Sequence, residues 1–259
     1  MVTKIKKPLA SILIVNFNNK NLLERSIKSC FNQDYKNCEI IIFDDLSTDG
    51  SRLELKKYKN IRIILNQKKT YIPYIDAMNA YFKMFNVSKG EFIFFLDSDD
   101  YFYPQKISTI IKLYLSDINK NMIQDFPKNF PYSKNSFISR WPFFSPTSCL
   151  SVRRNFFKEF VYFQKKNPNK YLNVWMDFRL SAYAYFKKNC LTSTAKPLTY
   201  YEQNLLENQS KKFPKLSYTW FERRFYSHLY INNISKKFFS FNIDYILTTI
   251  IYKTIKFFK

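Results

Sequence analysis

Residues 92–104 read FIFFLDSDDYFYP, an apolar run that ends abruptly in three acids within four positions. The length and aromatic content of residues 92–96 predict a buried strand, and Asp97, Asp99 and Asp100 follow where that strand would leave its sheet. Clustered carboxylates repel one another unless a cation binds them, and Mg²⁺ and Mn²⁺ favour such oxygen ligands. An acidic turn that caps a following helix is the alternative interpretation.

Two earlier apolar runs end in the same manner. Residues 9–15 (LASILIV) are followed by polar residues 16–19, and residues 39–43 are followed by Asp44 and Asp45. A continuous apolar run is typical of a parallel strand that is covered on both faces. Ligands of parallel sheets bind beyond the carboxyl ends of the strands, so we expect the three polar clusters to meet at one edge.

Segments with helical periodicity separate these apolar runs. This alternation, with right-handed crossovers, predicts an α/β fold with a doubly wound, mostly parallel sheet flanked by helices. We expect helices over residues 20–32, from a cap at Ser47 or Asp49 to about residue 58, over residues 72–85 and from Pro104, and a third strand over residues 61–65.

The alternation fades after residue 118. Residues 121–140 are polar and interrupted by proline, which predicts loops and short strands over the ligand edge. A strand-like run ends the segment 141–152, and residues 191–201 are expected to form a last strand. Further helices are predicted to residue 163, over residues 175–188 and from residue 215 to the end.

The composition limits the class of protein. With 259 residues, 46% hydrophobic and 20% aromatic, the chain is predicted to fold. Its two glycines, Gly50 and Gly90, exclude glycine-rich phosphate loops, so side chains and metal must hold any nucleotide. The four cysteines lack metal-binding spacing and are expected to be reduced. The net charge of +22 favours nucleic acid or an acidic membrane as partner, although A+T-rich coding also enriches lysine.

No apolar run reaches the roughly 20 residues of a membrane span, and residues 9–15 are too short for a signal sequence. We therefore expect a cytoplasmic protein. Residues 236–259 carry an apolar stripe beside lysines, which predicts a basic amphipathic helix at the inner face of the cytoplasmic membrane. A helix packed on the rest of the protein is the alternative. The stripe comprises Phe239, Ile243, Ile246, Ile250 and Phe257, beside Lys236, Lys237, Lys253, Lys256 and Lys259.

Four segments together match a known pattern: SILIVNFNN at residues 11–19, EIIIFDDLSTDGS at 39–51, KGEFIFFLDSDDYFYP at 89–104 and, more loosely, VWMDFRLSAYA at 174–184. The first three match in sequence, order and spacing. The chain resembles a family 2 glycosyltransferase with the GT-A fold.

The resemblance divides the chain into three parts. It implies that residues 1–118 form the nucleotide-sugar-binding half of a GT-A domain and that residues 119–205 form its acceptor-binding half. Residues 206–259 are then a helical carboxyl-terminal extension, for which the lysine-flanked stripe leaves open membrane contact or packing on the rest of the protein.

The resemblance also implies roles for the polar strand ends. Phe17 stands where most family members have a tyrosine that lines the uracil pocket, and ring stacking does not need the lost hydroxyl. Asp45 would accept a hydrogen bond from uracil, with Asp44 as support for the loop. Asp97 and Asp99 match the DxD motif, in which the first acid faces the ribose or the metal and the second binds Mn²⁺ or Mg²⁺ at the diphosphate. Nucleotide-sugar contacts are also implied for Val15, Asn18 and Asn66.

Asp177 matches the acid that the family places at a helix start as catalytic base, which implies direct displacement with inversion at the anomeric carbon. Met176 replaces the acid that usually precedes it. A first-turn acid that only complements the helix dipole is the alternative for Asp177.

Met78 stands where many members have an arginine near the diphosphate. Lys68 or Lys69 could replace that arginine, or both could be solvated surface residues.

Several candidates keep a purely structural interpretation. Phe17 could be a core aromatic, Asp45 a helix cap, and Asp100 a residue that closes its loop or caps the next helix. His228, the only histidine, is either an additional metal ligand or structural. Trp141 and Trp175 either stack on sugar faces or pack their own segments.

These patterns favour a metal-dependent inverting glycosyltransferase. It would transfer a hexosyl or N-acetylhexosaminyl group from a UDP-sugar to a hydroxyl of a glycan or glycolipid acceptor, such as a bacterial lipooligosaccharide or capsule. A basic, aromatic-rich nucleic-acid-binding protein is the alternative from another class, and the acids at the ligand edge argue against nucleic acid because they would repel its phosphates. A relative that binds nucleotide sugars without transfer is a third hypothesis.

Overall fold

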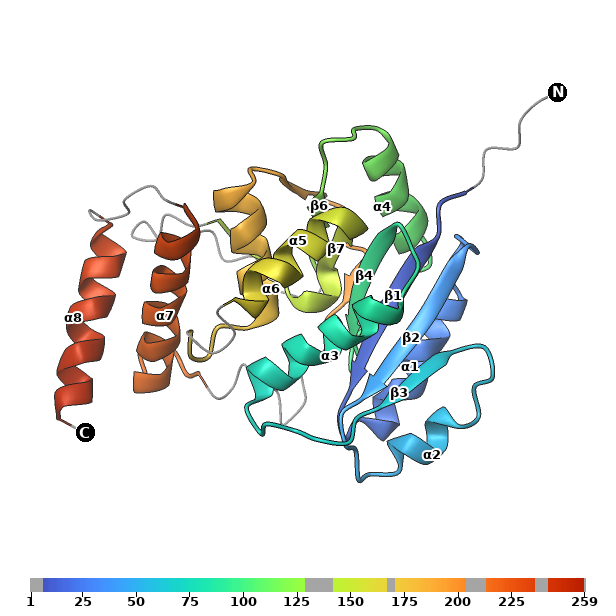
Figure 1. Cartoon of the computed structure of the whole chain (residues 1–259), viewed down its shortest axis with the longest axis horizontal. Coiled ribbons are helices and arrows are strands. Elements are labelled where there is room, and N and C mark those ends of the chain that lie inside the picture. Colours follow the sequence, from blue (N-terminus) through green and yellow to red (C-terminus); the bar gives the residue numbers. More distant parts are fainter. Residues whose placement is uncertain (1–6, 129–141, 167–170, 204–212, 236–241, 259) are drawn as a thin grey trace.

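The computed structural model describes residues 7–128, 142–166, 171–203, 213–235 and 242–258 (Figure 1). In these residues, seven strands form one sheet in the order β3-β2-β1-β4-β7-β6-β8, and the first four are parallel. Strand β7 is antiparallel to β4 and β6, and β8 is parallel to β6. The strands are β1 (Ala10–Asn16), β2 (Cys38–Asp44), β3 (Arg62–Leu65), β4 (Phe92–Asp97), β6 (Met122–Gln124), β7 (Leu150–Arg153) and β8 (Leu191–Ser193).

Helices cover both faces of this sheet, which confirms the predicted α/β fold (Figure 1). One face carries α1 (Lys20–Phe31), α2 (Ser51–Leu55) and α4 (Lys106–Leu115), and the other carries α3 (Pro73–Val87), α5 (Arg154–Lys165) and α6 (Met176–Ala182), which a π-helical segment continues (Tyr183–Lys187). A 3-10 turn (Thr147–Cys149) precedes β7, and β5 (Tyr101–Phe102) pairs with β9 (Thr199–Tyr200) in a small antiparallel sheet.

The two covered faces explain why the strands are continuously apolar. Along β1, Ile12 and Ile14 pack in the core with α1 and α4, whereas Leu13 packs in the core with α3 and α5, and all three side chains are fully buried. Burial of one such side chain contributes about 1.5–3 kcal/mol, so a polar residue in either register would be costly. The parallel core therefore fixes where β1, β2 and β4 end.

Three boundaries differ from the prediction. Residues 191–201 form two short strands in different sheets, because Thr194 N–H bonds to Gln124 and Leu198 N–H bonds to Asp125 between them. The second helix ends at Leu55 and is preceded by Gly50 at φ 90°. Neither predicted cap occupies that position, although Asp49 accepts a hydrogen bond from the N–H of Ser51 at 2.9 Å. The helix expected at Pro104 begins at Lys106.

Gly90 allows the start of β4 to approach β1. Its N–H donates to Ser11 Oγ at 2.8 Å and to Glu39 Oε1 at 2.9 Å. An added Cβ would lie 2.4 Å from Ser11 Oγ and 2.5 Å from the Ser11 nitrogen, closer than side chains tolerate. A larger residue at position 90 would therefore push the acidic loop of β4 out of register with β1.

Two further helices, α7 (Tyr218–Ser235) and α8 (Ile243–Phe257), stand at the end of the molecule away from β3, with α8 outermost (Figure 1). Helix α8 buries Asp244, Thr248 and Tyr252, while most of the predicted stripe faces outward. Its exposed fractions are 66% for Ile243, 43% for Ile246, 56% for Ile250 and 84% for Phe257, and Phe239 lies outside the described residues. No described helix is long and apolar enough to cross a membrane.

Lys106 is a fully buried cation beneath the acidic loop after β4. Its ammonium lies 2.6 Å from Asp125 Oδ1, 2.7 Å from the carbonyl oxygen of Ser148 and 2.6 Å from Thr199 Oγ1. These bonds join α4, the loop after β6, the 3-10 turn and β9. The ion pair therefore sets where the second half of the domain lies against the first.

Lys106→Met should lower the free energy of unfolding by about 3–5 kcal/mol, because it leaves the carboxylate of Asp125 buried without its partner. Urea unfolding measures this loss. Lys112→Met is the matched control, since Lys112 is exposed on the same helix, and it should change stability by no more than about 0.5 kcal/mol. Equal effects of the two substitutions would contradict the importance of the buried pair.

Candidate functional site

A cleft of about 450 Å³ opens at the carboxyl ends of β1, β2 and β4. The predicted site residues Val15, Phe17, Asn18, Asp45, Asp97, Asp99 and Asp177 all line it, and Asn66 does not. The remaining lining residues are Asn19, Lys69, Tyr71, Pro73, Asp76, Ala77, Ser98, Pro146, Thr147, Trp175, Tyr201 and Arg223. Acids that are far apart in the sequence thus share one cleft.

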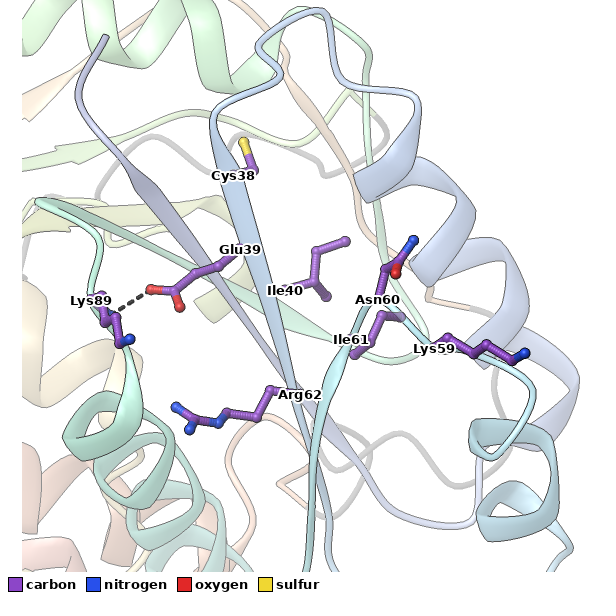
Figure 2. Close-up of a pocket in the computed structure, with 8 residues that line it drawn as sticks. All are labelled: Cys38, Glu39, Ile40, Lys59, Asn60, Ile61, Arg62 and Lys89. Carbon is purple, nitrogen blue, oxygen red and sulfur yellow. Dashed lines mark hydrogen bonds between the residues drawn. The ribbon is translucent and has the colours of Figure 1, made fainter. Parts of the chain in front are cut away.

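A second hollow, of about 550 Å³, lies at the opposite ends of β2 and β3 (Figure 2). Its only acid, Glu39, already accepts hydrogen bonds from Ser11 Oγ and from the N–H groups of Lys89 and Gly90. Ligands of parallel sheets bind at the carboxyl ends of the strands. The acidic cleft is therefore the better candidate, although it is smaller.

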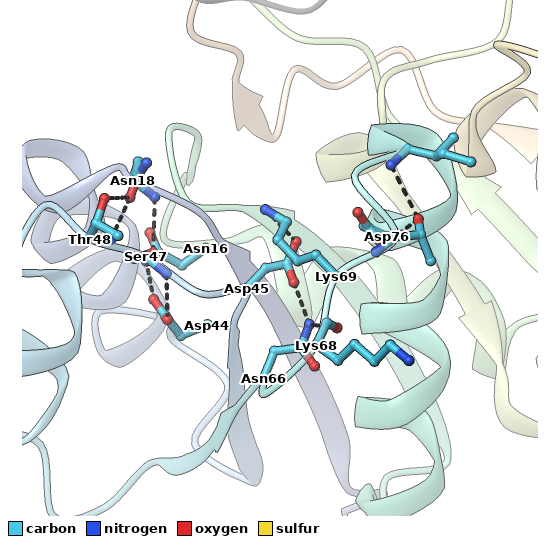
Figure 3. Close-up of polar contacts among 12 residues, drawn as sticks. Asn16, Asn18, Asp44, Asp45, Ser47, Thr48, Asn66, Lys68, Lys69 and Asp76 are labelled. Carbon is cyan, nitrogen blue, oxygen red and sulfur yellow. Dashed lines mark hydrogen bonds and ion pairs between the residues drawn. The ribbon is translucent and has the colours of Figure 1, made fainter.

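A buried hydrogen-bond network shapes the loop after β2 (Figure 3). Asp44 is fully buried and accepts hydrogen bonds from Asn16 Nδ2 at 2.9 Å, Ser47 N–H at 3.1 Å and Arg52 Nε at 2.7 Å. Asn18, at φ 49°, accepts a hydrogen bond from the N–H of Thr48 at 2.8 Å. Asp44 supports this loop, as expected, and its bonds leave the next residue to face the cleft.

Asp45 and Phe17 meet around the ammonium of Lys69. Lys69 Nζ lies 2.9 Å from Asp45 Oδ2 and 3.2 Å from the centre of the Phe17 ring. The Lys69 side chain is only 9% exposed, whereas the Phe17 side chain is 49% exposed. Asn66 donates to Asp45 Oδ1 at 2.6 Å, so it orients Asp45 from behind the cleft (Figure 3).

Met78 stands where many family members have an arginine, and the two lysines considered as its replacement, Lys68 and Lys69, have different surroundings. Met78 is buried in the core. Lys68 is exposed and points away from Asp45, whereas Lys69 points toward it (Figure 3). Asp76 holds the intervening loop, since its Oδ1 accepts hydrogen bonds from the N–H and the hydroxyl of Thr70. The solvated-surface interpretation therefore fits Lys68 and fails for Lys69.

The acids after β4 repel one another in a buried setting. Burial and the neighbouring Asp99 raise the pKa of Asp97 to about 7, although Tyr81 donates a hydrogen bond to Asp97 Oδ1 at 2.8 Å. Burial also raises the pKa of Asp99, and the nearby Glu202 adds to this effect. A cation at this position would relieve the repulsion.

The residues present fit Mg²⁺ or Mn²⁺. Asp97 and Asp99 offer hard carboxylate oxygens, and these cations typically take one or two carboxylates and complete their shell with substrate phosphates. Across the described parts of the chain, no group of three or more His, Cys, Asp or Glu side chains is placed to hold a metal. The protein would therefore contribute two carboxylates, and a bound diphosphate would contribute further oxygens.

Asp100 is fully buried and faces away from solvent. Its carboxylate accepts hydrogen bonds from Ser148 Oγ at 2.5 Å and from the N–H of Glu202 at 2.8 Å. Ser148 Oγ also accepts the N–H of Asp97 at 3.0 Å. Asp100 thus closes the acidic loop and does not cap α4, and Ser148 couples it to Asp97.

Asp177 enters the cleft from the first turn of α6. The N–H of Phe178 donates to its Oδ1 at 2.7 Å. Burial raises the pKa of Asp177, and the Arg223 guanidinium opposes part of that rise. Met176 packs in the hydrophobic core, so the missing acid leaves Asp177 as the carboxylate that α6 presents to the cleft. Trp175, just before this helix, lines the cleft beside it.

Sequence reasoning missed four lining residues that could take part in chemistry: Tyr71, Asp76, Tyr201 and Arg223. Asp76 has a buried Oδ2 without a hydrogen-bond partner among the described residues. Arg223 comes from α7, whose place in the fold no motif indicated. The only sequence signal for Arg223 was that it is a basic residue in a predicted helix that follows the catalytic segments.

Two sequence candidates lie elsewhere. His228 is buried between α7 and α8, and its Nε2 lies 3.2 Å from Asp244 Oδ2, so it contributes to helix packing and does not line the cleft. Trp141 lies outside the described residues.

Comparisons with known proteins agree with this geometry. The family model described as "Glycosyl transferase family 2" matches residues 11–190. UDP-Glc:alpha-D-GlcNAc-diphosphoundecaprenol beta-1,3-glucosyltransferase WfaP of Escherichia coli is 38% identical over 124 residues, which are 46% of this chain and 48% of that protein. The chain spans about half, or less, of the length of the curated relatives it matches.

Solved structures share the fold. Staphylococcus aureus TarS 1-349 in complex with UDP-GlcNAc superposes with a TM-score of 0.64 at 17% identity, covering 94% of this chain and 70% of that chain. The mannosyltransferase PcManGT from Pyrobaculum calidifontis, in complex with GDP-Man and Mn²⁺, gives 0.57 at 11% identity, covering 90% and 66%. The family match extends over more than half of the chain, and the predicted GT-A fold is confirmed. This chain belongs to glycosyl transferase family 2.

Proposed function

We propose that this protein transfers a hexosyl or N-acetylhexosaminyl group from a UDP-sugar to a hydroxyl of a lipid-linked or polymeric surface glycan, with inversion at the anomeric carbon. The observation that carries this proposal is the convergence of Phe17, Asp45, Asp97, Asp99 and Asp177 on one cleft. An aromatic face and a carboxylate suit a pyrimidine, and two hard acids suit a cation at a diphosphate.

In this proposal, the acceptor hydroxyl attacks the anomeric carbon while the bond from that carbon to UDP breaks. Asp177 takes the hydroxyl proton, and its raised pKa makes it a stronger base than an exposed aspartate. The N–H of Phe178 holds the carboxylate in place. Asp97 and Asp99 would hold a Mg²⁺ or Mn²⁺ ion, which would supply electrostatic stabilisation of the departing diphosphate.

The donor must also displace Lys69. Its ammonium lies over the face of Phe17 at the separation that a stacked base would adopt, and it is paired with the carboxylate that uracil would use. The uracil ring and the Lys69 ammonium cannot both occupy the face of Phe17. We propose that Lys69 swings toward the diphosphate when the base enters, which supplies the positive charge that Met78 does not.

The outward stripe of α8 supports contact with an anionic membrane. Ile246, Ile250 and Phe257 are exposed on a helix that also exposes Lys253 and Lys256. Apolar side chains beside lysines match the hydrocarbon boundary and the negative surface of the cytoplasmic leaflet. A lipid-linked acceptor, which the name of the related WfaP specifies for that enzyme, would be reached from this surface.

The acids that line the cleft argue against the alternative function, which is nucleic-acid binding. The cleft collects Asp45, Asp76, Asp97, Asp99 and Asp177. A phosphate backbone would be repelled by these acids, so the positive net charge has no matching groove there.

Asp99→Asn should lower metal-dependent release of UDP at least about 100-fold, because the cation loses a ligand. Asp177→Asn should lower it by roughly 10²- to 10⁴-fold without weakening UDP binding, because only proton transfer is lost. Assays with several UDP-hexoses and titration calorimetry with UDP and Mn²⁺ measure these effects. Asp117→Asn is the control, because Asp117 is a half-buried acid just after α4 that does not line the cleft, and full turnover by Asp99→Asn would overturn the metal role.

Lys69→Ala should strengthen the binding of uridine about fivefold, because the base no longer breaks an ion pair worth about 1 kcal/mol. The same substitution should weaken the binding of UDP, whose phosphates lose a cation. Calorimetric titration of both ligands checks this reversal of sign. If uridine and UDP are weakened equally, Lys69 contacts the base and does not give way to it.

Ile250→Ser with Phe257→Ser should reduce binding to vesicles of phosphatidylglycerol and phosphatidylcholine at least about tenfold, since each exposed side chain contributes about 1.5–3 kcal/mol on burial. Vesicle flotation measures the bound fraction. Leu53→Ser is the matched control, because Leu53 is an exposed leucine on α2, far from α8. Equal binding of the wild-type protein to neutral vesicles, or no binding at all, would contradict this proposal.

A further inference from the structure

Arg223 is a cation that the carboxyl-terminal helices contribute to the cleft. It lies on α7 and lines the cleft with Asp177, Trp175 and Tyr201. Residue 223 is outside the segment 11–190 that the family model matches. The role of this arginine therefore has to be derived from its surroundings.

The neighbouring arginine shows that the position of Arg223 is distinctive. Arg224 turns away from the cleft and forms an ion pair with Asp244 of α8. Among the described residues, Arg223 forms no such ion pair, and its guanidinium carbon lies 5.2 Å from the centre of the Phe213 ring. One arginine thus fastens α8 to α7, and the other is directed to the cleft.

The charges of the cleft are arranged in two groups. On the nucleotide side, Lys69 is paired with Asp45. On the other side, Arg223 is close enough to Asp177 to oppose the rise in pKa that burial causes. Asp97 and Asp99, where the donor diphosphate and its cation are proposed to bind, line the same cleft. Arg223 is therefore on the side of the base, where the accepting hydroxyl must lie.

We propose that Arg223 binds a phosphate group of the acceptor, attached to the sugar whose hydroxyl is glycosylated. The proposal rests on the proposed function. A guanidinium matches phosphate oxygens with two parallel N–H donors. In a sugar 1-phosphate, the 3- and 4-hydroxyls lie across the ring from the phosphate, so a base at one of these hydroxyls and a phosphate-binding group would lie within about one ring of each other. Asp177 and Arg223 line the same cleft and are close enough for the guanidinium to influence the carboxyl group.

This assignment gives the carboxyl-terminal helices a common task. Helix α7 would hold the phosphate of the acceptor, while the exposed face of α8 would meet the membrane from which a lipid diphosphate projects. The surface and the subsite are fastened together by the ion pair of Arg224 with Asp244.

The test compares two acceptors that carry the same sugar with and without a diphosphate: a short-chain prenyl diphosphate of N-acetylglucosamine and the neutral prenyl glycoside of N-acetylglucosamine with the same chain. For Arg223→Gln, KM for the diphosphate acceptor should rise about 10- to 100-fold, as expected for a lost charge-assisted hydrogen bond. The kcat/KM for the neutral acceptor should not change. Arg223→Lys should give an intermediate KM, and Lys112→Gln, which removes an exposed charge elsewhere, should have no effect.

The assays are made on the alkaline plateau of the pH profile, where Asp177 is ionised in both proteins, so that its pKa does not enter. Equal losses for both acceptors would assign Arg223 to Asp177 and overturn the proposal. Weaker binding of UDP would assign it to the donor diphosphate and do the same. If the wild-type protein transfers no sugar, the proposed function fails, and equilibrium binding of the prenyl diphosphate sugar to wild type and Arg223→Gln still decides this inference.

Discussion

The mutual repulsion of carboxylates at the end of a buried parallel sheet is the constraint on which this structure depends. Three strands whose sides are fully covered must all end at one edge, and two of them end in acids. The protein stabilises the inner acids with neutral donors and cations: Asp44 with Asn16 and Arg52, and Asp100 with Ser148. The outer acids remain in the cleft, where burial raises the pKa values of Asp97 and Asp99.

The sequence predicted the fold of residues 1–118 well because the interactions that define these strands and helices are local. The continuous apolar runs of β1, β2 and β4 are typical of a covered parallel sheet, and acids follow directly after two of them. The fold of residues 119–205 was less predictable, since β6, β7 and β8 are short strands defined by long-range pairing. The burial of Lys106 against Asp125 could not be read from a polar loop, because only the tertiary fold brings the two together.

The candidate site shows the same division. Sequence motifs predicted the acids of the site, whereas the directions of the neighbouring side chains are known only from the fold. Lys69 looked like a surface lysine but covers Phe17, and Asn66 orients Asp45 from behind. Arg223 had no motif at all, because its helix reaches the cleft only through packing of α7 on the segment around Tyr171 and Val174. Residues that act through position, and not through spacing in the chain, are those that sequence reasoning could not assign.

The central claim is that carboxylates from β2 and β4 form one donor site around a cation and a pyrimidine. A crystal structure of the protein soaked with UDP and Mn²⁺, with anomalous data at the manganese edge, tests it most directly. The account predicts a manganese peak shared by Asp99 and the diphosphate, with uracil stacked on Phe17 and bonded to Asp45. UDP bound in the hollow beside Glu39 and Arg62, or a manganese peak remote from Asp99, would contradict it.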